Sequence, residues 1–172
     1  MIIIEGPDNS GKSTLAKAIG LPIKHPGPKP ESVRAVIDCL RKQQRRRSHA
    51  IVHDRVTCIS HWIYQQPAIV MCRLLDQKLQ FLRTSSNVVI VYCRPPDSSI
   101  LNWSHHIPKG YVTAEYLDWL STEHPKIVKR YDEFFSASGN CPNPIRFDYV
   151  NDDLNDVVEY LRKSQEGLRY GK

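Results

Sequence analysis

Short apolar runs alternate with longer amphipathic stretches along this chain. The apolar runs predict strands buried inside a sheet, and they span residues 1–5, 21–24, 50–54, 87–93 and 145–150. Between them, apolar residues recur at helical spacing and predict helices over 13–19, 33–40, 67–82, 113–135 and 154–161. Pro125 predicts a break or kink in the fourth of these helices. Strands that alternate with helices imply an α/β fold whose parallel sheet is covered on both faces.

The composition fits one soluble domain. The chain has 172 residues, the size of a single domain that can bury a sizeable core. No apolar run is long enough to span a bilayer, and the start at Met1 lacks the basic region of a secretory signal. The cysteines form no CxxC pair, which argues against a zinc site or a disulfide framework. We therefore expect a cytoplasmic protein with reduced thiols and no membrane association.

The formal charge of +6 has much of its excess in one basic run, residues 41–47. A basic run at a helix end is usually a solvated face that suits the helix dipole, and the alternative is a site for an anionic partner. No aromatic residues alternate with the basic ones, as they do on surfaces that bind single-stranded nucleic acid. Nucleic-acid binding is therefore not expected.

A phosphate-binding motif follows the first predicted strand. The residues from Gly6 to Ser13 fit the pattern G-x-x-x-x-G-K-[ST], between an apolar strand and a helix, which is the context that the motif requires. Its glycines let the backbone wrap a phosphate, and the amides at the helix N-terminus point inward at it. Lys12 is expected to reach the β- and γ-phosphates of ATP, and Ser13 to supply an oxygen to Mg²⁺. The sequence therefore predicts a P-loop.

A second candidate site stands where the strand over 50–54 ends. In a parallel sheet the carboxyl ends of the strands face the ligand crevice, and Asp54 and Arg55 occupy that position. The carboxylate can hold a magnesium-bound water or orient the attacking oxygen, and the guanidinium can clamp a second phosphate with two hydrogen bonds. A salt-bridged pair at a strand end is the alternative. The predicted catalytic residues are thus Lys12, Asp54 and Arg55, and the predicted metal ligands are Ser13 and Asp54.

These segments resemble the thymidylate kinase family. Residues 4–14, which read IEGPDNSGKST, are similar to the opening EGxDGxGKST of that family. Residues 54–65 resemble its segment DR(Y/H)…S…YQ, and their form is closer still to the thymidylate-kinase-like nucleotide kinases carried by bacteriophages. Residues 129–132, which read KRYD, are similar too. The resemblance runs through most of the chain and would place a phage-encoded protein in the host cytoplasm.

The resemblance implies a P-loop NTPase fold with a five-stranded parallel sheet, strand order 2-3-1-4-5, and a small mobile lid. It also implies Mg²⁺-dependent transfer of the γ-phosphoryl group of ATP to a nucleoside monophosphate. By match to the motifs, Asp8 would hold the 3′-hydroxyl of the acceptor sugar and Arg55 the acceptor phosphate. Residues 24–27 stand where the family has Arg-Glu-Pro-Gly. Lys24 or His25 would therefore replace a phosphate-binding arginine, without its bidentate fork.

Two departures from the family pattern bear on the acceptor base. The segment before Asp54 is short and lacks a clear counterpart of the phenylalanine and arginine that hold thymine in the family, and only Arg34 falls at roughly the right spacing. Ser60 and Tyr64 are displaced by one residue from the bacterial pattern. A pocket without a dedicated polar reader discriminates weakly between bases. We therefore expect more than one deoxynucleoside monophosphate to be accepted, with dTMP and a purine such as dGMP among the candidates.

The lid is predicted over residues 100–111. The P-loop carries Asn9 where some family members place an arginine, and members without that arginine tend to bring positive charge from the lid. Arg94 at the base of the lid and Lys109 beside Gly110, a potential hinge, are therefore predicted to contact phosphate. The apolar run over 68–72 predicts a homodimer interface, as in the resembling family.

The predicted binding residues form two sets. The ATP set consists of Asp8, Asn9, Ser10, Gly11, Lys12, Ser13, Thr14, Arg94 and Lys109. The acceptor set consists of Asp8, Lys24, His25, Arg34, Arg55, Ser60, Tyr64 and Arg73.

Two other function classes stay open. A deoxynucleoside kinase also has a P-loop and a strand-end acid followed by arginine, and there the acid deprotonates a sugar hydroxyl. A P-loop ATPase or switch module that binds protein or DNA is the other alternative. Such modules usually have a strand that ends in Asp-Glu, whereas the strand over 87–93 ends without an acid.

Overall fold

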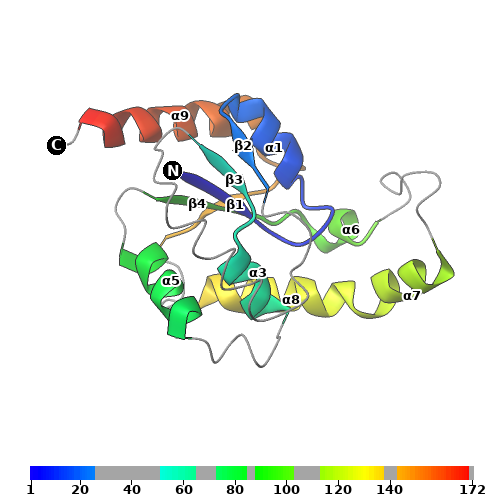
Figure 1. Ribbon diagram of the computed structural model, residues 1–172. Coiled ribbons are helices and arrows are strands. Elements are labelled where there is room, and N and C mark those ends of the chain that lie inside the picture. The colour runs from blue at the N-terminus through cyan, green and yellow to red at the C-terminus, as the bar shows by residue number, and fades with distance from the viewer. Residues whose placement is uncertain (26–50, 65–72, 85–87, 103–112, 138–142, 171–172) are drawn as a thin grey trace.

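Figure 1 shows the computed structural model of the chain, which describes residues 1–25, 51–64, 73–84, 88–102, 113–137 and 143–170. Within these residues one parallel sheet is formed, with the strands β1 (Ile2–Glu5), β2 (Ile23–Lys24), β3 (Val52–Asp54), β4 (Val89–Cys93) and β5 (Ile145–Phe147). Their order is β2-β3-β1-β4-β5. Both the predicted α/β class and the strand order 2-3-1-4-5 are confirmed.

Helices cover both faces of this sheet (Figure 1). One face packs against α1 (Lys12–Ile19) and α9 (Leu154–Tyr170). The other packs against α3 (Thr57–Ile63), α5 (Arg73–Thr84) and α8 (His124–Ser136). Two further helices, α6 (Asp97–Ile100) and α7 (Ala114–Thr122), lie beyond the edge at which the strands end.

The central strand β1 supplies both halves of the core. Its side chains alternate between the two faces, so Ile3 joins the cluster under α3 and α8, while Ile2 and Ile4 join the cluster under α1 and α9. All three isoleucines are fully buried. A strand covered on both faces has no polar alternation, which is why the run at the start of the chain is apolar throughout.

Register brings several loops to one edge of the sheet. Ile4 of β1 lies opposite Asp54 at the end of β3, and Glu5 lies opposite Tyr92 of β4. Because all pairs are parallel, the loops after β1, β3 and β4 leave the sheet side by side. That edge is where the sequence predicts the ligand crevice.

Some elements differ from the prediction. The helices α3 and α6 fall where no helix is predicted, since both are too short to show a helical period. The predicted break near Pro125 is confirmed, because the segment over 113–135 forms two helices and Pro125 lies in the first turn of α8, where no intrahelical bond needs its missing N–H. The last strand ends at Phe147 instead of continuing to 150, because the Asp148 carboxylate accepts the Val150 N–H (2.9 Å) and turns the chain.

Other predictions fall on residues outside this description. The predicted helix over 33–40 lies wholly outside it, as do the first residues of the one over 67–82, whose described part is α5. Among the helices that are described, none is both long and apolar enough to cross a bilayer.

Candidate active site

The loop between β1 and α1 closes tightly against its neighbours. Gly6 has a φ of 152°, and a Cβ added there would stand 2.5 Å from the carbonyl oxygen of Cys93 on β4. Gly11 has a φ of 81°, and a Cβ added there would stand 2.8 Å from Cδ1 of Tyr149. Both positions therefore require glycine. Cys93, which forms the floor under Gly6, is fully buried, and burial raises the pKa of its thiol to about 12.

The N-terminus of α1 is open to an anion. Gly11 is its N-cap residue, and no side chain caps this end within the described structure. The first amides of a helix lack intrahelical partners and carry the positive end of the helix dipole. A phosphate is the ligand such an end accepts most readily. This cradle fits a phosphate group.

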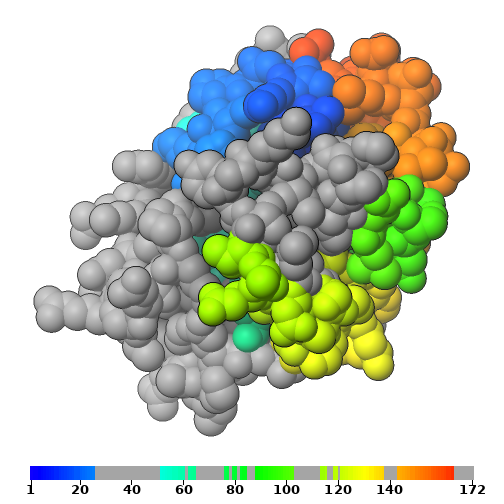
Figure 2. Space-filling view, turned by 90° about the vertical axis from the view of Figure 1, so that its right-hand side faces the viewer, coloured from blue at the N-terminus to red at the C-terminus, as the bar shows by residue number. Residues whose placement is uncertain are grey.

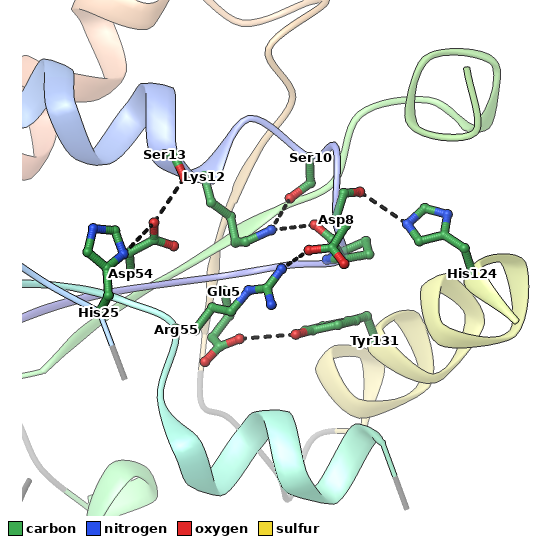
Figure 3. A network of polar contacts seen from close by, with 11 residues as sticks. Glu5, Asp8, Ser10, Lys12, Ser13, His25, Asp54, Arg55, His124 and Tyr131 are labelled. Carbon is green, nitrogen blue, oxygen red and sulfur yellow. Dashed lines mark hydrogen bonds and ion pairs between the residues drawn. The ribbon is translucent and has the colours of Figure 1, made fainter. Parts of the chain in front are cut away.

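Lys12 points back over the loop (Figure 3). Its ammonium donates to the carbonyl oxygen of Pro7 and to Oγ of Ser10, the latter at 3.3 Å. The residue is only 6% exposed, and this burial lowers the pKa of its ammonium to about 8. A phosphate anion beside Lys12 would stabilise the charged form, so the loop holds the lysine where an anion improves its environment.

Ser13 and Asp54 form an oxygen pair at the start of α1. Ser13 Oγ donates to Asp54 Oδ2 at 3.0 Å, and Nδ1 of His25 lies 3.3 Å from the same carboxylate oxygen. Mg²⁺ with ligands at about 2.1 Å places neighbouring octahedral oxygens about 3.0 Å apart, which fits the Ser13–Asp54 pair. No group of three or more His, Cys, Asp or Glu residues is placed to hold a metal within the described part of the chain. Such a site suits an ion that keeps waters and binds substrate phosphates.

Arg55 lies on the other side of Lys12 and pairs with the P-loop. Its guanidinium donates to Oδ1 of Asp8, and both side chains are about a third exposed, at 28% and 31%. Burial alone would raise the pKa of Asp8, but the charges of Arg55 and Lys12 outweigh burial and hold that pKa below its ordinary value. The structure thus joins two of the predicted acceptor-binding residues, Asp8 and Arg55, into one ion pair.

A buried carboxyl group stands behind this pair. Glu5 is fully buried at the end of β1, where it accepts the main-chain N–H of Val56 and, at 3.3 Å, the hydroxyl of Tyr131 on α8. Burial raises the pKa of its carboxyl to about 7. Helix α8 also supplies His124, whose Nε2 lies 3.2 Å from the carbonyl oxygen of Asp8. Because a carbonyl only accepts, Nε2 carries the proton of this contact.

Asn9 ties the P-loop to α6. It has a φ of 61°, and its side-chain amide donates to the carbonyl oxygens of Ser99 (3.1 Å), Ile100 (3.1 Å) and Asn102 (3.0 Å). These carbonyls lie at and just after the C-terminal end of a short helix, and that of Ser99 also accepts the Asn102 N–H at 3.3 Å. Figure 2 views this side of the molecule, where the residues after β5 (orange) adjoin both α1 (blue) and the α6 region (green).

Arg94, a predicted phosphate contact, is engaged elsewhere in the structure. Its guanidinium donates to Asp132 through Nε (2.8 Å) and Nη2 (2.9 Å), and to Asp97 through Nη2 (2.6 Å). The hydrogen bonds to Asp132, together with the one to Asp97, hold the pKa of Arg94 above its ordinary value. A phosphate would have to compete with two carboxylates for this side chain, so contact with ATP stays a prediction.

The remaining predicted residues divide by position. Thr14 is exposed on the first turn of α1, and Lys24 ends β2 half-buried beside His25. Ser60 and Tyr64 lie on and just after α3; Ser60 Oγ is buried without a hydrogen-bond partner among the described residues. Arg34 and Lys109 lie outside the described residues, as does most of the predicted lid, and Arg73 opens α5 with a side chain that is not described.

Sequence analysis missed the residues that support the site from behind. Glu5 and Tyr131 each stand within a segment that resembles the family. That resemblance is the signal from which both residues could have been identified. His124 and Tyr149 carry no such signal, because their contacts with the P-loop span 116 residues in one case and 138 in the other.

Comparisons with known proteins define the fold. No family model matches the chain, and no curated protein sequence does. Among solved structures, the YorR protein from Bacillus subtilis in complex with phosphorylated GDP matches 99% of this chain and 98% of its own, with 19% identity and a TM-score of 0.70. Deoxyadenosine kinase from M. mycoides with bound dATP matches over 94% and 97%, with 18% identity and a TM-score of 0.52.

A gluconokinase from Sinorhizobium meliloti 1021 also matches, over 98% of this chain and 90% of its own, with 18% identity and a TM-score of 0.51. Together with the strand order and the P-loop, these matches define the chain as one with the fold of P-loop kinases. At such identities the likeness defines the fold, and the substrate has to be argued from the site.

Proposed function

We propose that this chain is an ATP-dependent kinase that phosphorylates nucleoside monophosphates. The observation that carries the proposal is the meeting of two phosphate-binding devices at one sheet edge. A P-loop with Lys12 and the Ser13–Asp54 pair stands on one side, and Arg55 stands on the other. Phosphoryl transfer needs two substrates in line and cationic groups around the moving charge.

On the donor side, the amides of the P-loop and the N-terminus of α1 would bind the β- and γ-phosphates. Lys12 would turn from the Pro7 carbonyl toward the γ-phosphoryl oxygens and stabilise the charge that spreads over them. Ser13 and Asp54 would hold Mg²⁺, which neutralises phosphate charge when bound. The acceptor oxygen forms a bond to the γ-phosphorus while the bond to the leaving oxygen of ADP breaks.

On the acceptor side, Arg55 would exchange part of its contact with Asp8 for the acceptor phosphate. The released carboxylate oxygen of Asp8 can then accept a hydrogen bond from a sugar hydroxyl. Lys24, which ends β2, would add charge beside the same phosphate, and His25, whose Nδ1 lies 3.3 Å from Asp54, would add a hydrogen-bonding group there. A monophosphate oxygen is already a competent nucleophile, so this reaction needs no strong general base.

The resemblance to thymidylate kinases and their phage-borne relatives sharpens the acceptor to deoxynucleoside monophosphates. The base-reading pair of that family has no clear counterpart here, so we propose that several bases are accepted, dTMP and dGMP among them. The nucleotide in the YorR structure is a guanine nucleotide, which is compatible with a purine acceptor. We further propose a cytoplasmic homodimer, whose predicted interface over 68–72 lies outside the described residues; light scattering on the purified chain measures its mass.

A deoxynucleoside kinase is the second candidate. Arg55 is already paired with a carboxylate, Asp8, and an arginine so neutralised is less available to a second phosphate. A neutral sugar hydroxyl could approach Asp54 or Asp8 instead.

ADP release with a panel of acceptors separates these functions. We expect turnover with at least one of dTMP, dGMP, dAMP and dCMP at fixed ATP and Mg²⁺, and little with the corresponding nucleosides. Faster turnover with thymidine or deoxyguanosine would favour the second candidate. ADP release that no acceptor stimulates would instead indicate an ATPase or a switch module. The variant Lys12→Ala serves as the blank, because we expect it to fold but to lack the phosphate-binding cation.

A further inference from the structure

The backbone at Arg55 is held in an unusual conformation. Its φ of 73° lies in the left-handed region, which residues with a Cβ seldom adopt unless their surroundings enforce it. Two hydrogen bonds flank this turn. The N–H of Arg55 donates to the carbonyl oxygen of Ile4 (2.9 Å), and the N–H of Val56 donates to the Glu5 carboxyl group. Ile4 and Glu5 at the end of β1 therefore accept hydrogen bonds from Arg55 and Val56 after β3, and we call this pair of bonds the clasp.

Glu5 is an unexpected residue for its position. A fully buried carboxyl group is costly unless hydrogen bonds satisfy it, and an apolar residue would continue the pattern of Ile2, Ile3 and Ile4. Both of its oxygens have partners, one on the Arg55 turn and one on Tyr131 of α8. Figure 3 shows the Glu5 side chain between the Arg55 segment and α8. The carboxyl group thus links three elements that are distant in the sequence.

Helix α8 supports both members of the Arg55–Asp8 pair. His124 and Tyr131 are two turns apart on the helix and so lie on one face of it. His124 contacts the main chain of Asp8, and Tyr131 contacts Glu5, which in turn holds the Arg55 turn. The stacking of Tyr131 on Phe135 and Tyr92 leaves its hydroxyl in a fixed place.

We propose that Glu5 is a positioning residue for the acceptor site: its carboxyl group, anchored by Tyr131, fixes the left-handed turn that aims Arg55 at the acceptor phosphate. This inference rests on the proposed function, which assigns that phosphate to Arg55. The role is that of a hydrogen-bond acceptor for Val56. A protonated carboxyl group also keeps an oxygen free for this N–H while it donates to Tyr131. The pKa of the Glu5 carboxyl group is about 7, so both protonation states are present near neutral pH. The hydrogen bond from Val56 can form in either state.

The test compares two substitutions at position 5. Glu5→Leu removes the acceptor of the Val56 N–H, whereas Glu5→Gln keeps an oxygen there and can donate its amide to the Tyr131 oxygen. We expect Glu5→Leu to raise the KM for the best monophosphate of the panel by about tenfold or more. The KM for ATP should stay within about threefold, and Glu5→Gln should restore the acceptor KM. Equal changes in both KM values, or a wild-type acceptor KM in folded Glu5→Leu, would overturn the inference.

A double substitution isolates the route through Arg55. In an Arg55→Ala background, Glu5→Leu should leave the acceptor KM within about twofold, because residues that act through one another are not additive. A full additional increase in that background would show that Glu5 acts elsewhere.

If Glu5→Leu fails to fold, a pair of tyrosine substitutions takes its place. Tyr131→Phe removes the anchor of Glu5, and Tyr92→Phe removes the hydroxyl of a neighbouring stacked tyrosine that donates to Asp132 at 2.6 Å. Tyr131→Phe should raise the acceptor KM at least about threefold above Tyr92→Phe. Equal values for the two would count against the inference. Failure of the proposed function is distinguishable, since the wild type would then phosphorylate no monophosphate at all.

Discussion

The donor side and the acceptor side of this site differ in where their parts come from. Within the described residues, the donor side is built mainly from one contiguous stretch, residues 6–13, which Asp54 joins through its contact with Ser13. The acceptor side assembles Asp8 from the P-loop, Arg55 from the turn after β3, Glu5 from β1 and Tyr131 from α8. The donor side depends on backbone conformation, and the acceptor side on side chains that tertiary packing brings together.

This difference has a consequence for substitutions. A change at Lys12 or Ser13 should affect ATP more than the acceptor, because both side chains lie on the donor side of the loop. The acceptor side should respond to changes at the Glu5–Tyr131 contact, since packing of α8 against the sheet determines where that contact lies. Four substitutions test this contrast, beginning with the one that has the largest effect.

Lys12→Ala should reduce phosphoryl transfer by about 10³-fold or more, because removal of a single transition-state cation costs that much. The melting temperature should not fall, since the buried ammonium is already unfavourable to the fold, as its lowered pKa indicates. Single-turnover kinetics with saturating ATP measure the effect. Near-normal turnover in a folded Lys12→Ala protein would contradict the kinase assignment.

Glu5→Gln should change how stability depends on pH. The carboxyl pKa rises from 4.5 to about 7 on folding, so the folded state favours the protonated form. Ionisation of Glu5 therefore lowers the free energy of unfolding of the wild type as the pH rises from about 4.5 through about 7. The penalty approaches about 3 kcal/mol above that range. Glu5→Gln lacks the penalty, and urea unfolding of both proteins at pH 5 and pH 8 measures the difference. A difference that does not change with pH would contradict the buried ionisation.

Arg55→Ala should raise the acceptor KM by about 10–100-fold and leave the ATP KM within about threefold, because a charge-assisted bond to phosphate is lost on one side only. Arg162→Ala is the matched control. That arginine donates to the carbonyl oxygens of Ala18 and Ile19 at the end of α1, away from the site. Its removal should alter neither KM by more than about twofold. Equal loss of both substrates in Arg55→Ala would contradict the division of the site.

Gly11→Ala should have the smallest effect, a loss of about 1–2 kcal/mol in the free energy of unfolding together with weaker ATP binding. Gly20→Ala separates the two contributions. Gly20 has a similar φ of 76°, but its added Cβ would approach only the flexible end of Arg162, at 3.3 Å. It should cost about 1 kcal/mol without changing the ATP KM. If both variants bound ATP equally well, Tyr149 would not constrain the P-loop.

Much of the donor side could be predicted from sequence, because a motif of fixed spacing on a strand–loop–helix determines its own geometry. The strand order came through the resemblance. On the acceptor side, the end of a predicted strand indicated Arg55, and the resemblance added Asp8, with which Arg55 pairs. The contact of Glu5 with Tyr131 spans 126 residues, and it depends on how α8 packs, which no local pattern specifies. Asn9 was noted only because it stands where some family members have an arginine, whereas its amide binds the Ile100 carbonyl at the end of α6.

The position of Cys93 beneath Gly6 has a practical use. A fully buried thiol with a pKa of about 12 is nearly unreactive toward disulfide reagents. Reaction at this sulfur therefore has to wait until the P-loop separates from the end of β4. When the loop recloses faster than the reagent attacks, the rate of labelling gives the fraction of time that it is open. Peptide mapping would assign the label to Cys93. The opening of the phosphate-binding loop can therefore be measured without introducing a probe into the protein.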